Sequence, residues 1–300
     1  MNTNKKKPVF SIVGCGRLGI SLAVFLSKQG YVAKAFSSKS LESAQKALAF
    51  AGSGTVYKNP CDAVQSADIV FITTPDTIIE PVCRMISEHK GFSKNQIVFH
   101  LSGALPSSIL ASAQSCGAVI GSIHPLQAFA PYTKGQASQF KGINISIEGD
   151  DRAVQAGKAI VKALEAHSFT IPTHAKTLYH ASAVVASNYL VTLEHFALEL
   201  LKQADLSEQE GYRILEPLIL GTLKNIQSRG SVKALTGPVA RGDHEIVSRH
   251  IKDIDAKLPQ FSMLYRLLGR HTLDIADQNS QEGNSLSKQA KLALETLFKS

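Results

Sequence analysis

The chain has 300 residues, of which 44% are hydrophobic and 19% charged, and it contains no tryptophan. This length is enough for two domains, and no uninterrupted apolar stretch is long enough to cross a bilayer. The net charge of +8 does not indicate nucleic-acid binding, because the basic residues are spread along the chain and are not interleaved with aromatic residues. We therefore expect neither a membrane nor a nucleic acid as a partner.

The cysteines favour a reducing compartment. Cys15, Cys61, Cys83 and Cys116 are scattered, and no two of them form a C-x-x-C pair. They match neither a zinc site nor a disulfide framework. We expect a cytoplasmic protein without a bound metal.

The first half of the chain alternates strand-like and helix-like segments, which is typical of a parallel sheet with helices on its faces. The expected strands are residues 9–13, 31–36, 55–57, 68–73, 97–101, 119–122, 143–147 and 169–171. The expected helices are residues 20–28, 41–50, 60–65 and 152–166. The pattern predicts an α/β domain with a mostly parallel sheet over residues 1–173.

The alternation stops after Thr173, and the remaining sequence has a helical pattern throughout. The expected helices are residues 175–203, 207–228, 243–257, 259–278 and 287–298. We therefore expect an all-α C-terminal domain over residues 174–300, with the reaction site in the cleft between the two domains.

A glycine-rich loop separates the first strand from the first helix. Its sequence is Gly14-Cys15-Gly16-Arg17-Leu18-Gly19. In this position Gly14 permits a tight turn, Gly16 lets the backbone approach a pyrophosphate, and Gly19 lets the helix pack closely on the strand. The free N–H groups and the dipole of the helix then face the anion. The loop predicts a Rossmann-type dinucleotide site.

The end of the second strand indicates which dinucleotide is bound. An acidic residue there usually binds the ribose hydroxyls of NAD, but this chain has Ser37, Ser38, Lys39 and Ser40. Hydroxyls and an ammonium group suit a phosphate, so the sequence favours NADP over NAD. Ser38 or Ser40 can also cap the next helix.

Further candidates follow the strands that end at residues 73, 101 and 122. Thr74 and Pro75 are predicted to contact the cofactor, whereas Asp76 either does the same or caps the following helix. Ser102 and His124 each follow a strand, and each either lines the nicotinamide cleft or belongs to an ordinary turn.

The helix that opens the second domain carries a polar stripe. At about 100° per residue, Lys176, His180 and Ser187 lie on one side, and Asn188 flanks them. Such a stripe on an apolar helix needs partners, because desolvated polar groups cost free energy. The partners are either a substrate or an inter-domain hydrogen-bond network.

An irregular loop between two later helices supplies a candidate for substrate binding. Its sequence is Thr236-Gly237-Pro238-Val239-Ala240-Arg241-Gly242-Asp243. Arg241 can hold a substrate carboxylate through two parallel hydrogen bonds. Alternatively, Arg241 pairs with Asp243, which itself can cap the next helix. His250, further along that helix, belongs either to the core or to the site.

Together these motifs resemble one family across nearly the whole chain. The glycine loop, Ser102-Gly103, His124-Pro125, Tyr179-His180 with Asn188, and the loop of Arg241 are similar to Rossmann-like proteins with a C-terminal domain of unknown function, the DUF2520 type. These proteins belong with the phosphogluconate dehydrogenases, ketopantoate reductases and pyrroline-carboxylate reductases. The resemblance implies an NAD(P)-dependent oxidoreductase whose helical domain forms a homodimer.

One departure from the related enzymes concerns the acid. Hydroxyacid dehydrogenases and ketopantoate reductases carry Lys-x-x-x-Asn on the corresponding helix, with the lysine as acid/base and the asparagine on the substrate. This chain has Lys176-x-x-x-His180, and the likeness implies His180 as a proton donor in place of the lysine.

The leading hypothesis is hydride transfer from NADPH to a small carbonyl or imine compound. A histidine titrates near neutrality, so we expect His180 to be the acid, with His124 as the alternative and Lys176 as support. Arg241 would hold a substrate carboxylate, while Ser102 and Asn188 would orient the substrate. A non-catalytic NAD(P) sensor whose helical domain binds a protein is the alternative function.

Overall fold

The computed structural model describes residues 7–280 and 286–299. It divides the chain into two compact units, Met1–Ala186 and Ser187–Ser300, and each is described by itself. The domain boundary expected at residue 173 stays a prediction.

The first unit contains an eight-stranded sheet in the order β3-β2-β1-β4-β5-β6-β7-β8. Neighbouring strands are parallel except β6 and β7, which are antiparallel. The strands are β1 Val9–Val13, β2 Val32–Ser37, β3 Thr55–Tyr57, β4 Ile69–Ile72, β5 Ile97–His100, β6 Val119–Pro125, β7 Asn144–Gly149 and β8 His167–Thr170. The predicted α/β fold with a mostly parallel sheet is confirmed.

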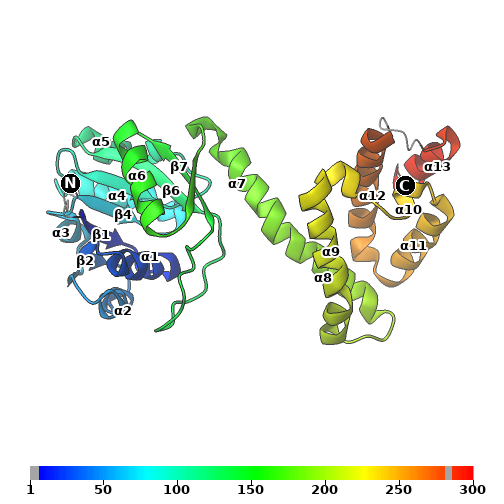
Figure 1. Ribbon diagram of the computed structural model, residues 1–300, viewed down its shortest axis with the longest axis horizontal. Coiled ribbons are helices and arrows are strands. Elements are labelled where there is room, and N and C mark those ends of the chain that lie inside the picture. The colour runs from blue at the N-terminus through cyan, green and yellow to red at the C-terminus, as the bar shows by residue number, and fades with distance from the viewer. Residues whose placement is uncertain (1–6, 281–285, 300) are drawn as a thin grey trace. The chain divides into compact units, whose positions relative to one another are not determined.

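Helices cover both faces of the sheet (Figure 1), and each face has its own core. One core joins the sheet to α1 (Arg17–Lys28), α2 (Leu41–Ala51) and α6 (Asp151–Ala163). The other joins it to α3 (Pro60–Val64), α4 (Asp76–Glu88), α5 (Ala111–Ser115) and the 3-10 turn η1 (Ser107–Leu110). Aromatic rings run across the first face, where Phe71 stacks on Phe99 and meets Phe10 edge-on. Burial on both faces explains the continuous apolar strands.

Among the boundaries that differ from the sequence prediction, two have a clear local reason. Helix α1 begins at Arg17 instead of Ile20, because Gly16 serves as its N-cap residue and the second half of the glycine loop is helical. Strand β6 runs past Ser122 to Pro125, because β7 pairs with it in antiparallel register as far as Pro125 and Ile145. His124 therefore lies within a strand and not in a turn after it.

The chain leaves the sheet through a long helical segment that is not one regular helix. A 3-10 turn η2 (Thr173–Ala175) precedes α7 (Lys176–Val184), a π-helical turn covers Val185–Tyr189, and α8 covers Leu190–Lys202. A π turn holds more residues than an α turn, so the 100° spacing used to place Ser187 beside Lys176 and His180 does not hold there. Ser187 and Asn188 are both exposed, whereas Lys176 is buried.

The second unit consists of helices throughout its described residues. They are α8, α9 (Glu208–Ala234), α10 (Pro238–Arg241), α11 (His244–Lys257), α12 (Pro259–Ser280) and α13 (Lys288–Lys299). Helix α9 is kinked at Gly230, where φ is 79°, just beyond the predicted helix end at Ser228. Val247, Leu273 and Phe298 belong to the core of α11–α13. No helix in the described ranges is both long and apolar enough to span a membrane.

Candidate functional site

The glycine loop is crowded at Gly14 and Gly19 and open at Gly16. Gly14 has a φ of +105°, and a Cβ built on it would lie 2.7 Å from the backbone of Thr73 and Thr74. A Cβ on Gly19 would lie 2.6 Å from Thr73 Oγ1 and closer still to the Gly14 carbonyl oxygen. A Cβ on Gly16 would meet no atom within 4 Å. The loop is therefore packed on its inner side and accessible at Gly16.

The open side of the loop coincides with the N-terminus of α1. Gly16 is the N-cap residue, and no side chain caps the helix. The first amides of a helix have no partner within the helix, and the dipole gives them a partial positive charge. Arg17 and Leu18, in this first turn, present such amides. These groups fit the pyrophosphate of a dinucleotide.

The end of β2 braces the loop from the side. The Gly14 amide donates to the Ser37 carbonyl at 2.8 Å, and the Cys15 amide donates to Ser38 Oγ at 3.3 Å. The Cys15 side chain points inward, and burial raises the pKa of its thiol to about 12. Lys39 is exposed, and Ser40 caps α2 through the amide of Ser43. The predicted cap at Ser40 is confirmed.

The end of β4 meets the same loop. The Thr73 hydroxyl donates to the Gly14 carbonyl, whereas the buried Thr74 hydroxyl has no hydrogen-bond partner. Pro75 is the N-cap residue of α4. Asp76 follows it, and its carboxylate accepts a hydrogen bond from Ser102 Oγ at 2.8 Å. The cap role considered for Asp76 was wrong. The orphaned Thr74 hydroxyl is one more group that a ligand at this edge can satisfy.

Ser102 is held in place by three hydrogen bonds to its own hydroxyl. It donates to Asp76 and accepts from the amides of Ala104 and Leu105, both at 3.1 Å. Its amide donates to Nδ1 of His100 at 3.1 Å, and Nε2 of that ring lies 3.2 Å from the Pro106 carbonyl. His100 therefore carries its proton on Nε2. The Ser102 hydroxyl supports the turn after β5.

Lys176 lies in a buried ionic network and not at the surface. Its side chain is 1% exposed, and its Nζ donates to the Ser102 carbonyl at 2.7 Å and to the Ser122 hydroxyl. Glu148 Oε1 lies 3.7 Å away. Glu148 also accepts hydrogen bonds from the amide and hydroxyl of Ser107 and from the Thr173 hydroxyl. Burial, more than the nearby carboxylates, decides the direction in which the pKa of Lys176 moves, which is down to about 8.

His124 stands beside this network and contacts two residues of α7. Its Nδ1 lies 3.0 Å from the Tyr179 hydroxyl, and its ring meets the rings of Tyr179 and His180 edge-on, with centroids 5.7 and 6.0 Å away. A Cβ on Gly103 would lie 2.6–2.8 Å from the imidazole, so that glycine packs against the ring face. Burial, assisted by Lys176 and His180, lowers the pKa of His124 to about 4. The imidazole is neutral at pH 7.

The two buried imidazoles make acid stability a testable property of this network. Burial lowers the pKa of His100 to about 3, so the unfolded chain binds its proton near pH 6.5 while the native state does not. The contribution of the neutral His100 to the free energy of unfolding is fully present above pH 6.5 and is lost as the pH falls toward 3. When the pH is lowered from 7 to 5, we expect His100 alone to reduce the free energy of unfolding by about 2 kcal/mol.

Urea unfolding at both pH values checks this expectation. His100→Gln should reduce the loss of stability on acidification by about 2 kcal/mol, whatever its effect at pH 7. His271→Gln, which removes an exposed histidine, is the matched control. An unchanged acid dependence in His100→Gln would contradict the assignment of a neutral His100.

The structure brings four of the six predicted catalytic residues together in the first unit, namely Ser102, His124, Lys176 and His180. Asn188 and Arg241 belong to the second unit. Arg241 Nε and Nη2 both lie 2.9 Å from Asp243 Oδ2, so the pairing considered from the sequence is present. Arg241 also lines a pocket of about 640 Å³ with Thr236 and Asn279.

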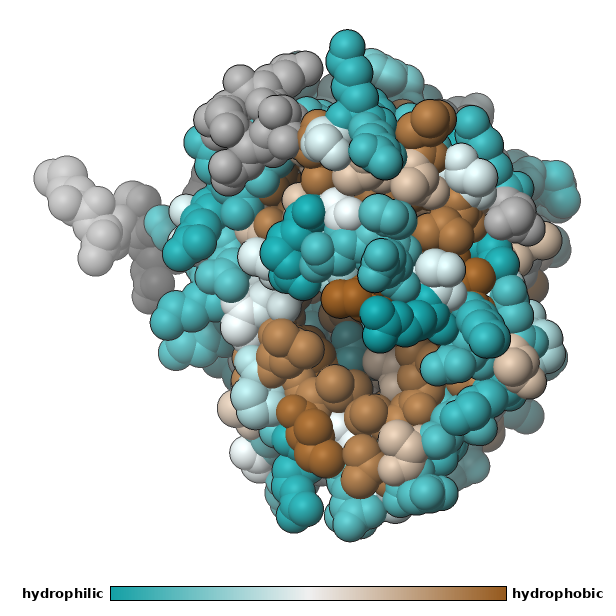
Figure 2. All heavy atoms as spheres, turned by 90° about the vertical axis from the view of Figure 1, so that its right-hand side faces the viewer, coloured by the Kyte–Doolittle hydropathy of each residue, from teal (hydrophilic) through white to brown (hydrophobic). Residues whose placement is uncertain are grey.

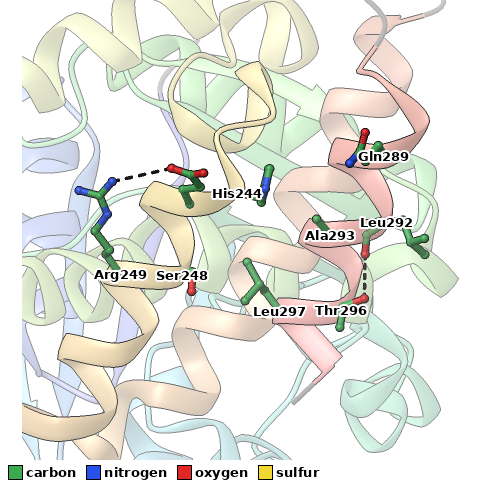
Figure 3. Close-up of a pocket in the computed structure, with 9 residues that line it drawn as sticks. His244, Ser248, Arg249, Gln289, Leu292, Ala293, Thr296 and Leu297 are labelled. Atoms are coloured by element: carbon green, nitrogen blue, oxygen red, sulfur yellow. Dashed lines mark hydrogen bonds and ion pairs between the residues drawn. The ribbon is translucent and has the colours of Figure 1, made fainter.

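Two other pockets of the second unit lie among its helices. His250 lines one of about 570 Å³, and its Nδ1 lies 2.9 Å from the Tyr265 hydroxyl. The other, of about 730 Å³, is a groove between α11 and α13 (Figure 3). The Arg249 guanidinium there turns toward Glu245 at 4.0 Å, and none of the predicted site residues lines this groove.

Sequence reasoning missed three residues of the buried network: His100, Ser122 and Glu148. Glu148 left a signal, because it follows the apolar run of a strand and a carboxylate there requires a buried partner. His100 and Ser122 were included only as parts of their strands. Nothing in the local pattern connects Glu148 to Lys176, which is 28 positions away.

The comparisons with known proteins match two domain models, the second of which begins within the first unit. A Rossmann-like domain model matches residues 2–125, and the model of a domain of unknown function, DUF2520, matches residues 143–272. No curated protein matches.

Several solved structures share the fold. A "putative NADP oxidoreductase" from Bacteroides fragilis is 22% identical, with a TM-score of 0.72 over 90% of this chain and 99% of its own. A protein from Thermotoga maritima is 25% identical, with a TM-score of 0.69 over 91% and 99%. An imine reductase from a Pseudomonas species is 17% identical, with a TM-score of 0.63 over 92% and 99%. The chain is thus a member of the Rossmann-like proteins that carry a DUF2520 domain.

Proposed function

We propose that this protein is an NADP-dependent oxidoreductase that transfers a hydride to a small carbonyl or imine compound. One observation carries the proposal. The carboxyl ends of β1, β4, β5 and β6 share one sheet edge, which joins an open, amide-lined glycine loop to a cluster of imidazole and phenol groups. Ligands of such sheets bind at this edge. The similar structures named an NADP oxidoreductase and an imine reductase support the same reaction class.

The residues fit a nicotinamide dinucleotide, which would supply the hydride. Gly14, Gly16, Gly19 and the amides of Arg17 and Leu18 would hold the pyrophosphate. The other proposed cofactor contacts are Cys15, Ser37, Ser38, Lys39, Thr74, Pro75 and Ser102.

NADP is favoured by the absence of a carboxylate from residues 37–40 and by the distribution of charge. Residues 1–186 contain 18 Lys and Arg against 10 Asp and Glu, so they carry the whole net charge of +8. A phosphorylated cofactor is attracted by such a field.

The proposed roles of the remaining residues follow their positions. His180 and His124 lie next to each other and are the candidates for proton transfer. Lys176 would support them by anchoring α7 to the sheet. A substrate carboxylate would require an accessible cation. Lys176 is 1% exposed, whereas the side chain of Arg241, although paired with Asp243, is 61% exposed. Arg241 therefore remains the proposed carboxylate-binding residue, and Asn188 the proposed second contact. A cytoplasmic location also remains our proposal.

Nucleotide titration followed by a turnover assay tests the function. We expect saturable quenching or enhancement of nicotinamide fluorescence with NADPH, at lower concentrations than with NADH. Oxidation of NADPH should then be measured against 2-keto acids and cyclic imines, together with small molecules that co-purify with the native protein. No saturable change with either nucleotide would refute the proposal.

We also propose that the second unit pairs with a second copy of the chain. Large apolar side chains are exposed along the helical segments from the π turn to α12, among them Tyr189, Val191, Leu218, Leu220 and Met263. Apolar side chains surround a hollow in the face shown in Figure 2. Residues 187–300 contain 14 Lys and Arg and 14 Asp and Glu, so two copies meet without net repulsion. Exposed apolar surface of this kind marks an interface.

Light scattering checks the pairing. We expect a mass of twice 32.2 kDa at micromolar concentration and a shift toward the monomer for Leu218→Glu combined with Leu220→Glu. Leu292→Glu, on an exposed side chain of α13, controls for the added charge. A wild-type mass of one chain at every concentration would exclude the dimer.

A further inference from the structure

Most polar side chains at the carboxyl ends of β5 and β6 have no hydrogen to give to a substrate. The Ser102 hydroxyl already donates to Asp76 and accepts from two amides. Lys176 is 1% exposed and has three partners, namely the Ser102 carbonyl, Ser122 and Glu148. His100 is 0% exposed, and both of its ring nitrogens are engaged. These groups build the site but cannot release a proton into it without breaking its supports.

His180 also lacks a route for its proton at one of its nitrogens. Its Nδ1 is buried and has no hydrogen-bond partner. His180 could therefore offer a substrate only its Nε2, and no hydrogen-bond partner fixes its Nδ1. The half-buried Tyr179 and His124, by contrast, hold each other in direct contact, with 3.0 Å between the hydroxyl and Nδ1.

The contact between Tyr179 and His124 is fixed from several directions. Gly103 packs on one face of the imidazole so closely that a Cβ would overlap it. The Tyr179 ring is held edge-on against Phe169, with centroids 5.9 Å apart. Tyr179 lies one turn after Lys176 on α7, and the ion pair of Lys176 anchors that turn to the sheet. Hydroxyl and Nδ1 are therefore positioned before any ligand binds.

We propose that Tyr179 is the proton donor of the reaction and that His124 is its hydrogen-bond partner. This proposal rests on the reductase function proposed above. It requires His124 to be neutral and to carry its single hydrogen on Nδ1, from which it donates to the Tyr179 oxygen. The phenolic hydrogen then points away from the imidazole, toward the substrate.

The step balances as follows. A bound reduced dinucleotide would supply the hydride and would itself be oxidised. Addition of this hydride to the carbon of the C=O or C=N bond moves the electron pair of that bond to the heteroatom. The O–H bond of Tyr179 breaks, and its proton forms a new bond to the heteroatom. The phenolate that remains is stabilised by the Nδ1–H of His124, and a proton from water restores the phenol. The product is the alcohol or amine, and no other reductant is needed.

The ionisation of both groups agrees with this geometry. Burial raises the pKa of the Tyr179 hydroxyl, so the phenol holds its proton at neutral pH. Burial lowers the pKa of His124 to about 4, so the imidazole is a neutral hydrogen-bond donor and not a competing acid. A buried phenol is a weak acid alone, and the fixed N–H is what makes release feasible.

The first test measures the contact between Tyr179 and His124 in the absence of substrate. In protein labelled with 15N-histidine, long-range proton–nitrogen NMR at pH 7 should show His124 protonated on Nδ1, its signals being assigned by their absence in His124→Asn. Tyr179→Phe should shift those signals. Tyr265→Phe removes an equivalent phenol–imidazole contact, to His250 at 2.9 Å, and should leave the His124 signals unchanged. A His124 proton on Nε2, or signals unaffected by Tyr179→Phe, would overturn the proposal.

The second test measures turnover. Tyr179→Phe should bind NADPH as the wild type does but reduce the best substrate of the panel with kcat lowered about 10²–10⁴-fold and KM little changed. Tyr265→Phe should retain wild-type turnover. If Tyr179→Phe keeps kcat within about threefold, Tyr179 is not the donor even though the reductase function stands. If the wild type binds neither nucleotide, the reductase function fails, and the donor role fails with it.

Discussion

Replacing Lys176 with methionine is expected to destabilise the first unit by about 3–5 kcal/mol, because it leaves the carboxylate of Glu148 buried without its cation. The two side chains are 1% and 2% exposed, with 3.7 Å between Nζ and Oε1. Methionine keeps the length of the stem but removes the hydrogen bonds to the Ser102 carbonyl and to Ser122. Urea unfolding measures the loss, and hydrogen exchange of the β5 and β6 amides assigns it to this unit.

A double variant separates the charge from the packing. Adding Glu148→Gln to Lys176→Met removes the unpaired charge while an amide oxygen can still accept from Ser107. We expect the double variant to be more stable than Lys176→Met alone, since much of the cost comes from the orphaned carboxylate. A double variant no better than the single one would mean that the lost hydrogen bonds, and not the charge, dominate.

A surface pair gives the matched control. Lys46 and Glu42 approach to 2.7 Å, which is shorter than the buried pair, but their side chains are 60% and 73% exposed. Lys46→Met should leave the free energy of unfolding unchanged within the error of the measurement. The contrast follows because water solvates a surface carboxylate whether or not its partner is present. Burial, and not distance, sets the size of the effect.

The sequence predicted the eight strands of the first unit and the helices α1, α2, α3 and α6, because each is specified locally, but it gave no range for α4 or α5. Apolar runs bounded by turn residues marked the strands, and the glycine loop marked the first crossing from strand to helix. The antiparallel pairing of β7 with β6 was not predicted. It depends on which strands meet, and it extends β6 as far as His124 and Pro125.

Of the residues that meet in the first unit, the sequence predicted Ser102, His124, Lys176 and His180, but not their hydrogen-bond partners. Helical spacing identified Lys176 and His180 as polar positions on an apolar helix. It could not show that Lys176 turns into the protein, because Glu148 and Ser122 come from strands of the sheet. It also could not foresee the π turn at Val185–Tyr189, since a pattern of residue types does not distinguish hydrogen bonds between residues four apart from those between residues five apart.

We expect Gly19→Ala to lose stability and Gly16→Ala to lose affinity for the cofactor. A methyl group on Gly19 would overlap the Gly14 carbonyl and Thr73 Oγ1, so α1 must move off β1 and the Thr73–Gly14 hydrogen bond is strained. We expect Gly19→Ala to lose about 3 kcal/mol or more in the free energy of unfolding. A loss below about 1 kcal/mol would show that the loop relaxes easily and that its close packing is not required.

Gly16→Ala tests binding where Gly19→Ala tests folding. Gly16 has a φ of −80° and no atom within 4 Å of a built Cβ, so alanine fits the backbone and should change stability by no more than about 1 kcal/mol. Its methyl group would instead enter the space where we place the pyrophosphate, and NADPH affinity should fall at least tenfold, about 1.4 kcal/mol. Fluorescence titration of the two variants measures their NADPH affinity, and thermal unfolding measures their stability. A Gly16→Ala protein that binds NADPH as tightly as the wild type would move the cofactor away from this loop, since no dinucleotide can approach these amides without meeting that methyl group.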